Sequence, residues 1–361
     1  MMAKSMNMVK EQVREGTLYT LPEVGDRIKL NQNENPYDLP EPLKRKITEA
    51  LQEIPWNRYP RLGSPDFRNR VGDWLELDGS QVMVGNGSNE ILLAVMNTLL
   101  EPGKQMVTIE PTFSLYQHYG ELFGAKVNAC RLRERFTFPV EQIVRMINQE
   151  PTALTVLCSP NNPTGSVISE SGLRKILGAG DGFVLVDEAY LDFCEQDFNP
   201  LLKEYDNLIL TRTFSKAFAF AAGRFGYGLA SPEFVEQVYK VLLPYNLNGL
   251  TEAAAGLLLD HKDWMEPIIS EIVSERDRLI HRLNEIQGVE AFPSQSNFFL
   301  IRPECDSDRL YNRLLDRGIL IRDVSHYPGL ENYLRISTGR PEENRQVIST
   351  MQEILPELMQ E

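Results

Sequence analysis

Cysteine and histidine are both scarce in this sequence. It holds four of each among 361 residues, and they lie far apart rather than at metal-ligand or disulfide spacing. Isolated thiols of this kind are typical of proteins in a reducing compartment. We therefore expect no metal site, no disulfide framework and no histidine-based catalytic triad.

Excess basic charge and long hydrophobic runs are also lacking. Lysine and arginine number 37 against 51 acidic residues, a net charge of −14, whereas nucleic-acid-binding proteins usually carry a basic footprint. The longest apolar run, at 91–100, is too short to span a bilayer. The N-terminal residues have no apolar core of the kind found in a secretory signal. The sequence predicts a cytoplasmic protein without a nucleic-acid or membrane partner.

The order of sequence patterns predicts an α/β protein. The middle of the chain alternates short apolar runs with helical patterns, as in a mainly parallel sheet flanked by helices. After a long helical pattern, shorter apolar segments indicate a smaller α+β domain. We expect an N-terminal arm at 1–29 that packs with the small domain, a large domain at 30–255 and a small domain at 256–361.

Polar motifs directly follow three apolar runs that we expect to be buried strands. The runs at 153–158, 182–186 and 207–211 lead into SPNNPTG, DEAY and RTFSK. In open α/β sheets, ligands gather outside the carboxyl ends of the strands. The sequence therefore predicts a site at this edge of the sheet.

A lysine in the third motif has an unusual setting. Lys216 lies between hydroxyl residues and a run of small and apolar ones, with Arg224 eight positions further on. An amine among apolar neighbours is costly unless its charge is used or suppressed. Earlier in the chain, Gly85 and Gly87 open a helix whose free N–H groups could hold a phosphate. Taken singly, the glycine turn is better explained as a plain helix start, SPNNPTG can be a tight loop, and Lys216 fits a surface position equally well.

Taken together, the motifs resemble the fold-type I pyridoxal 5′-phosphate (PLP) enzymes. The spacings fit as well, with 25 positions from Asn162 to Asp187, 29 from Asp187 to Lys216 and eight from Lys216 to Arg224. Within that group, LNQNENPY, RYP, SPNNPTG, VDEAY, FSKAF and LRIS resemble the histidinol-phosphate aminotransferases. Threonine-phosphate decarboxylases and some aromatic aminotransferases share much of this pattern. The resemblance covers nearly the whole chain.

The resemblance assigns roles to the polar groups at the predicted sheet edge. Lys216 would hold PLP as a Schiff base and then move a proton between substrate and cofactor carbons. Apolar crowding and a nearby cation would lower the pKa of Lys216, so that the free amine exists at neutral pH. Asp187 would keep the pyridine nitrogen protonated. Asn162 and Tyr190 would hydrogen-bond the phenolic oxygen of the ring.

The cofactor phosphate would lie at the start of the helix. The backbone N–H groups of Ser88 and Asn89 would bind it, together with Ser215 and Arg224 and, more weakly, Thr213. Arginine supplies planar, bidentate donors that suit a phosphate dianion.

Two aromatic residues complete the cofactor site that the resemblance implies. Phe113 would stack on the face of the pyridine ring, where many relatives have tyrosine. Tyr59 in RYP would reach the PLP phosphate of a partner subunit. A homodimer with shared active sites is the consequence.

The resemblance also implies a substrate-binding set. Arg335 would bind the substrate carboxylate, and Arg322 would add a second positive charge for a phosphate, although Arg322 fits a surface position equally well. Tyr19 is a weaker candidate for closing the pocket, and Asn162 would face the substrate as well.

The activity implied is transamination of L-histidinol phosphate with 2-oxoglutarate, giving imidazole-acetol phosphate and glutamate in histidine biosynthesis. Threonine-phosphate decarboxylation and aromatic aminotransfer remain open, because one constellation of residues can labilise different bonds at the substrate carbon. A ligand-sensing regulator is the non-enzyme alternative. It is disfavoured because Lys216, Asp187 and Arg224 are all present and the net charge is −14.

Overall fold

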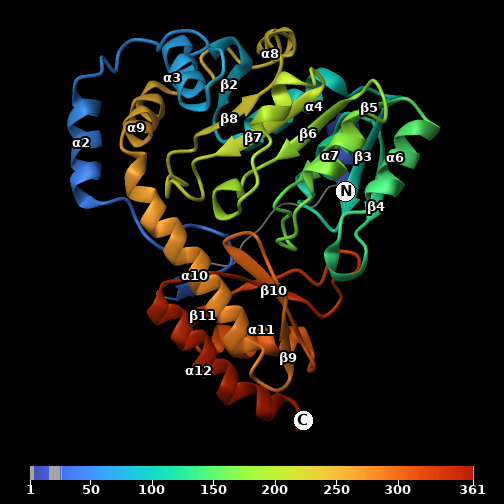
Figure 1. Cartoon of the computed structure of the whole chain (residues 1–361), viewed down its shortest axis with the longest axis vertical. Helices are drawn as coiled ribbons and strands as arrows, with labels where there is room; N and C mark the ends of the chain where they lie inside the picture. Colours follow the sequence, from blue (N-terminus) through green and yellow to red (C-terminus); the bar gives the residue numbers. More distant parts are fainter. Residues whose placement is uncertain (1–3, 16–24, 26, 361) are drawn as a thin grey trace.

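A mainly parallel sheet of seven strands occupies the centre of the larger part of the molecule (Figure 1). The computed structural model describes residues 4–15, 25 and 27–360. The strand order is β2-β8-β7-β6-β5-β3-β4, and only β8 runs antiparallel to both of its neighbours. The strands are β2 (Val82–Gly85), β3 (Gln105–Glu110), β4 (Lys126–Arg131), β5 (Thr152–Cys158), β6 (Phe183–Asp187), β7 (Leu208–Thr213) and β8 (Gly226–Leu229).

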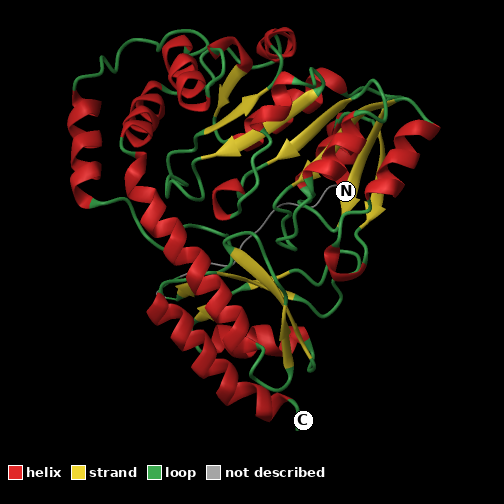
Figure 2. Ribbon diagram, viewed as in Figure 1, coloured by secondary structure: helices red, strands yellow, loops and turns green. Residues whose placement is uncertain are grey.

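Helices cover both faces of this sheet (Figure 2). Successive side chains of β6 point to opposite faces of the sheet, and both faces are buried. Val184 and Val186 belong to one buried cluster, and Leu185 belongs to the other. A strand buried on both faces reads as a continuous apolar run. The three strands predicted from such runs are confirmed as β5, β6 and β7.

One buried cluster of the sheet contains residues of α2, α3, α6, α7 and α9, and the other contains residues of α4, α5 and α8. These helices are α2 (Glu41–Gln52), α3 (Pro65–Leu75), α4 (Ser88–Leu99), α5 (Leu115–Leu122), α6 (Val140–Gln149), α7 (Glu170–Leu177), α8 (Pro232–Tyr239) and α9 (Gly249–Asp260). Short 3₁₀ turns join several elements: η1 (Lys4–Met8), η2 (Gly79–Gln81), η3 (Glu134–Phe136), η4 (Leu191–Phe193), η5 (Asn199–Lys203) and η6 (Lys262–Trp264).

A second, antiparallel sheet of four strands follows in the last part of the chain. Its order is β12-β13-β10-β9, with β9 (Val289–Ala291), β10 (Phe298–Pro303), β12 (Arg322–Asp323) and β13 (Leu334–Ser337). The helices α10 (Met265–Leu283), α11 (Ser307–Asp316) and α12 (Pro341–Leu358) bury apolar residues with this sheet. The long helical pattern expected here is confirmed as α10, which begins below α9 in Figure 1 and runs along the second sheet, where it contacts β9 and β10.

The N-terminal segments contact both parts of the molecule. The short helix α1 (Glu11–Glu15) lies against α5, whereas β1 (Ile28–Lys29) pairs in parallel with β11 (Ile319–Leu320). The predicted division of the chain at 29 and 255 stays a prediction. Among the described residues, no helix is long and apolar enough to cross a membrane.

Candidate active site

A cavity of about 720 Å³ opens where β5, β6 and β7 end, and residues of β12 and β13 line it as well. Parallel strands deliver the residues after their carboxyl ends to one edge, and β13 faces that edge from the second sheet. Twelve of the predicted site residues line this cavity: Ser88, Asn89, Phe113, Asn162, Asp187, Tyr190, Thr213, Ser215, Lys216, Arg224, Arg322 and Arg335. A second cavity of about 840 Å³, between the ends of α4 and α6, contains none of them.

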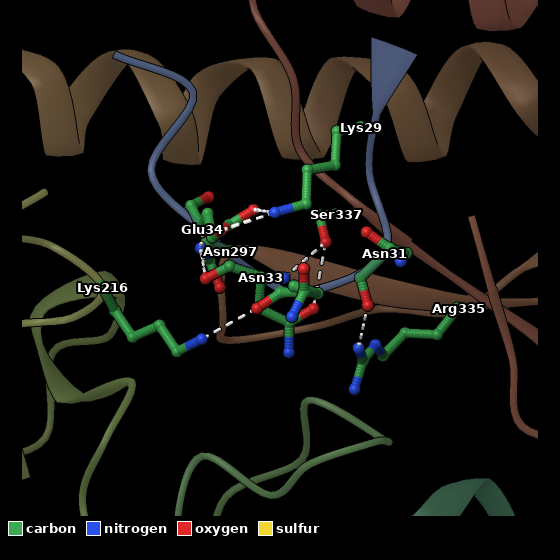
Figure 3. Close-up of polar contacts among 9 residues, drawn as sticks. Lys29, Asn31, Asn33, Glu34, Lys216, Asn297, Arg335 and Ser337 are labelled. Carbon is green, nitrogen blue, oxygen red and sulfur yellow. Dashed lines mark hydrogen bonds and ion pairs between the residues drawn. The ribbon is translucent and has the colours of Figure 1, made fainter. Parts of the chain in front are cut away.

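Lys216 follows β7 and points toward the segment after β1 (Figure 3). Its Nζ donates to the Gln32 carbonyl at 2.8 Å. Burial lowers the pKa of Lys216 to about 7, and the cations of Arg335 and Arg224 act in the same direction against the opposing charge of Glu34. The lowered pKa predicted from the apolar neighbours is therefore confirmed, and much of the amine is uncharged at neutral pH.

Asp187 is the last residue of β6, and its carboxylate is almost fully buried. The Tyr116 hydroxyl donates to Oδ2 at 2.6 Å, and the Ala189 N–H and the Thr211 hydroxyl donate to Oδ1 at 3.1 and 3.3 Å. Burial nevertheless raises the pKa of Asp187, because these donors and Lys216 only partly offset desolvation. A cationic ligand atom in contact with this carboxylate would remove that cost.

Asn162 and Tyr190 lie between the two sheets. Arg335 of β13 donates from Nη1 to Asn162 Oδ1 at 2.5 Å and from Nη2 to the Asn31 carbonyl at 2.8 Å. The buried Tyr190 hydroxyl accepts a hydrogen bond from Asn33 Nδ2 at 3.0 Å. Arg335 is thus held by contacts to the loop after β5 and to the segment after β1.

An anion-binding cradle lies at the start of α4. A Cβ on Gly87 would lie 2.6 Å from Arg224 Nη2, and a Cβ on Gly226 would lie 2.2 Å from the Ser88 nitrogen. Only glycine at these two positions lets the guanidinium and the helix N–H groups approach so closely. Arg224 also donates from Nη1 to Ser215 Oγ at 3.2 Å. Free helix N–H groups beside an arginine suit a phosphate.

Of the predicted site residues that the structure describes, Tyr59 does not line the cavity. Tyr59 is 81% exposed, and its ring stacks on Tyr245 with 4.6 Å between centroids. Tyr19 lies outside the described residues.

The structure adds site residues that were assigned no role from the sequence motifs. Asn31, Gln32 and Asn33 line the cavity, although the LNQNENPY motif itself was noticed, and Tyr116 binds Asp187. His326 also lines the cavity, and burial lowers its pKa. The run of amide side chains after β1 was the sequence signal that could have identified Asn31, Gln32 and Asn33 as site residues.

The polar groups of the cavity match a particular kind of ligand. The cradle at α4 suits a phosphate, Asp187 suits a protonated ring nitrogen, and the free amine of Lys216 suits a carbonyl carbon. A phosphorylated pyridine aldehyde carries all three features in one molecule. The residues present therefore fit PLP.

Comparison with known proteins agrees with this chemistry. The family model for aminotransferase class I and II matches residues 25–351, and the chain belongs to this PLP-dependent family. Among its relatives, the histidinol-phosphate aminotransferase of Chlorobium phaeovibrioides is 38% identical over 325 residues, which are 90% of each chain.

Solved structures share the fold at lower identity. The histidinol-phosphate aminotransferase from Sinorhizobium meliloti in complex with pyridoxal-5′-phosphate matches with a TM-score of 0.86 and 22% identity, over 96% of this chain and 97% of that one. The L-threonine-O-3-phosphate decarboxylase from Porphyromonas gingivalis matches with a TM-score of 0.81 and 24% identity, over 91% and 99%. Fold alone therefore does not distinguish these two reactions.

Proposed function

We propose that the protein is a PLP-dependent aminotransferase that converts L-histidinol phosphate and 2-oxoglutarate into imidazole-acetol phosphate and glutamate in histidine biosynthesis. The observation that carries this proposal is the single cavity in which Lys216, Asp187 and the cradle at α4 face Arg335. The relative from Chlorobium supports the choice of substrate through its name and its identity over most of the chain. The cytoplasmic location stays a prediction.

Lys216 and Asp187 carry the chemical step in this proposal. The cofactor, when bound, supplies a conjugated ring that takes up the electron pair released at the substrate carbon. Lys216 binds it covalently and then carries the proton of that carbon, a task that suits an amine with a pKa of about 7. Asp187 holds the proton on the ring nitrogen. Its burial strengthens that interaction, because low dielectric increases charge attraction.

The phosphate and the ring are held by separate groups. The backbone N–H groups of Ser88 and Asn89 bind the phosphate together with Arg224 and Ser215. Thr213 contributes indirectly, because its hydroxyl accepts from the Ser215 N–H at 3.1 Å.

Three side chains position the ring itself. Phe113 covers one face of the ring, and its own ring is set edge-on to Tyr116 at 5.6 Å. Asn162 and Tyr190 supply hydrogen bonds to the ring oxygen. Each of these residues acts by orientation rather than by proton transfer.

Substrate binding is assigned to the face formed by β12 and β13. Arg335 and Arg322 are paired across these antiparallel strands, so both cations lie at one side of the cavity. Two cations suit a substrate that carries a phosphate dianion, and Arg335 also suits the carboxylate of glutamate. Tyr19 remains the proposed closing residue.

A half-reaction tests the proposed substrate. L-Histidinol phosphate added to the PLP-loaded protein, without an oxo acid, should replace the absorbance of the Lys216-bound cofactor by that of pyridoxamine phosphate. An unchanged spectrum would refute this substrate. Release of carbon dioxide from threonine phosphate would then assign the decarboxylase reaction.

A homodimer is the second part of the proposal. The exposed Tyr59 stacks on the exposed Tyr245, and the same two chain segments carry further exposed apolar side chains, namely Trp56, Leu62 and Leu243. Large exposed apolar patches mark protein–protein contacts, and a second copy of this chain is the occupant that we propose. In the dimer, the partner subunit's Tyr59 would donate to the cofactor phosphate.

The Tyr59→Phe variant tests the shared site. We expect the variant to remain dimeric by sedimentation and to bind PLP about tenfold more weakly, because one charge-assisted hydrogen bond is lost. The matched control is Tyr245→Phe, which should bind PLP normally. A monomeric wild-type protein, or unchanged PLP affinity in the Tyr59 variant, would contradict the shared site.

A further inference from the structure

Asn33 occupies a constrained position between the two sheets. The residue is only 1% exposed, and its backbone has a φ of +54°, a left-handed conformation that asparagine tolerates better than most residues. Its N–H donates to Ser337 Oγ at 2.9 Å, and its carbonyl accepts from Asn297 Nδ2 at 3.0 Å (Figure 3). The backbone of Asn33 is therefore fixed by residues of the second sheet and its flanking loop.

The same contacts fix which way the Asn33 amide points. The Ser337 hydroxyl accepts from the Asn33 N–H, so its own hydrogen is free to go to Asn33 Oδ1 at 3.0 Å. In the flipped orientation, two N–H groups would point at one hydroxyl oxygen, and the hydroxyl hydrogen would lose Oδ1 as its acceptor. The amide oxygen therefore faces Ser337, and Nδ2 faces Tyr190 at 3.0 Å.

The direction of this contact determines where the Tyr190 hydroxyl hydrogen can point. An amide NH₂ group only donates, so the Tyr190 oxygen must accept from Asn33. The Tyr190 hydrogen is consequently directed away from Asn33. Tyr190 lines the cavity that holds Lys216 and Asp187, and the ring oxygen of PLP is the acceptor that the proposed function places there.

We propose that Asn33 is a positioning residue that directs the Tyr190 hydroxyl hydrogen toward the ring oxygen of the cofactor. This inference rests on the proposed function, because it requires PLP in the cavity. Asn33 acts through Tyr190 and need not touch substrate or cofactor itself.

The position of Ser337 adds a link to substrate binding. Ser337 and Arg335 are two residues apart on β13, so their side chains share one face of the strand. Arg335 is the proposed binding residue for the substrate carboxylate, and Ser337 orients the Asn33 amide. One strand of the second sheet thus positions both the substrate-binding arginine and, through Asn33, the hydroxyl of Tyr190 at the first sheet.

The Asn33→Asp variant exchanges donor and acceptor in the contact between residue 33 and the Tyr190 hydroxyl, while the shape of the side chain is nearly unchanged. Aspartate tolerates the left-handed backbone, but its carboxylate accepts from Tyr190 and turns the hydroxyl hydrogen away from the ring oxygen. A hydroxyl that donates to the ring oxygen stabilises its anion. Its loss should therefore raise the pKa at which the visible absorbance of the Lys216-bound cofactor titrates, by about one pH unit.

The Y190F background separates this effect from the added charge. A carboxylate near the cofactor raises the same pKa by electrostatics alone, and that part persists without the Tyr190 hydroxyl. We expect N33D to raise the titration pKa by about one pH unit more in the wild-type background than in Y190F. Equal shifts in the two backgrounds would overturn the proposal and leave Asn33 a structural residue.

Ser337→Ala provides a second variant that changes no charge. Removing its hydroxyl frees the Asn33 amide to flip, so the titration pKa should rise in the same direction by a smaller amount, and again only when Tyr190 is present. An S337A protein that titrates like the wild type would also overturn the proposal. A wild-type protein without any borohydride-reducible cofactor band would instead refute the proposed function, so the two failures are distinguishable.

Discussion

Replacement of Lys216 by alanine should lower kcat for amino transfer by at least about 10⁴-fold, because both the covalent attachment and the proton carrier are lost. Borohydride treatment of the PLP-loaded wild type should fix the cofactor to the peptide that contains Lys216, as detected by mass. The K216A variant should show no such adduct. The matched control is K240A, which removes an exposed lysine directly after α8 and should retain both adduct and activity. A reducible adduct in K216A would contradict the assignment.

The low pKa of Lys216 adds a pH signature to the same residue. Because burial and the cations of Arg335 and Arg224 lower this pKa to about 7, the free amine should accumulate between about pH 6 and 8. The rate at which the cofactor-free protein captures PLP should rise through that range and then level off. An ordinary lysine would continue to gain free amine up to about pH 10. A capture rate that keeps rising beyond pH 9 would contradict the lowered pKa.

The sheet edge was predictable because parallel topology converts sequence order into spatial proximity. Strands buried on both faces are recognisable as continuous apolar runs, and the residues that follow them must meet at one edge. Asn162, Asp187 and Lys216 are brought to one cavity for this reason. The spacing between motifs then indicated the family.

Contacts between residues that are far apart in the sequence were not predictable in this way. Asn33 meets Ser337 across 304 positions, and this contact depends on how the segment after β1 passes between the two sheets. Likewise, Tyr116 reaches Asp187 from α5, across 71 positions, because of the packing of that helix on the sheet. No local pattern encodes such packing. Tyr59 is a different case, because its proposed role needs a second copy of the chain.

Replacement of Asp187 by asparagine should lower kcat by about 10³-fold while leaving the cofactor bound. Burial raises the pKa of Asp187 in the protein without ligand, so the buried carboxylate is costly until a cation lies against it. A protonated ring nitrogen is that cation, and the carboxylate in turn raises the pKa of the ring nitrogen. Asparagine can still accept from the Tyr116 hydroxyl, but it cannot stabilise the ring cation by charge.

Retention of PLP distinguishes this role from a merely structural one. The cradle at α4 and the Lys216 amine are intact in D187N, so the borohydride adduct should form as in the wild type. The control is Y116F, which removes one donor to Asp187 Oδ2 but keeps the charge. That variant should lose only about tenfold in kcat, since one hydrogen bond to a charged group is lost. Unchanged turnover in D187N would show that the ring nitrogen needs no anionic partner. Loss of the cofactor would show instead that Asp187 acts mainly in binding.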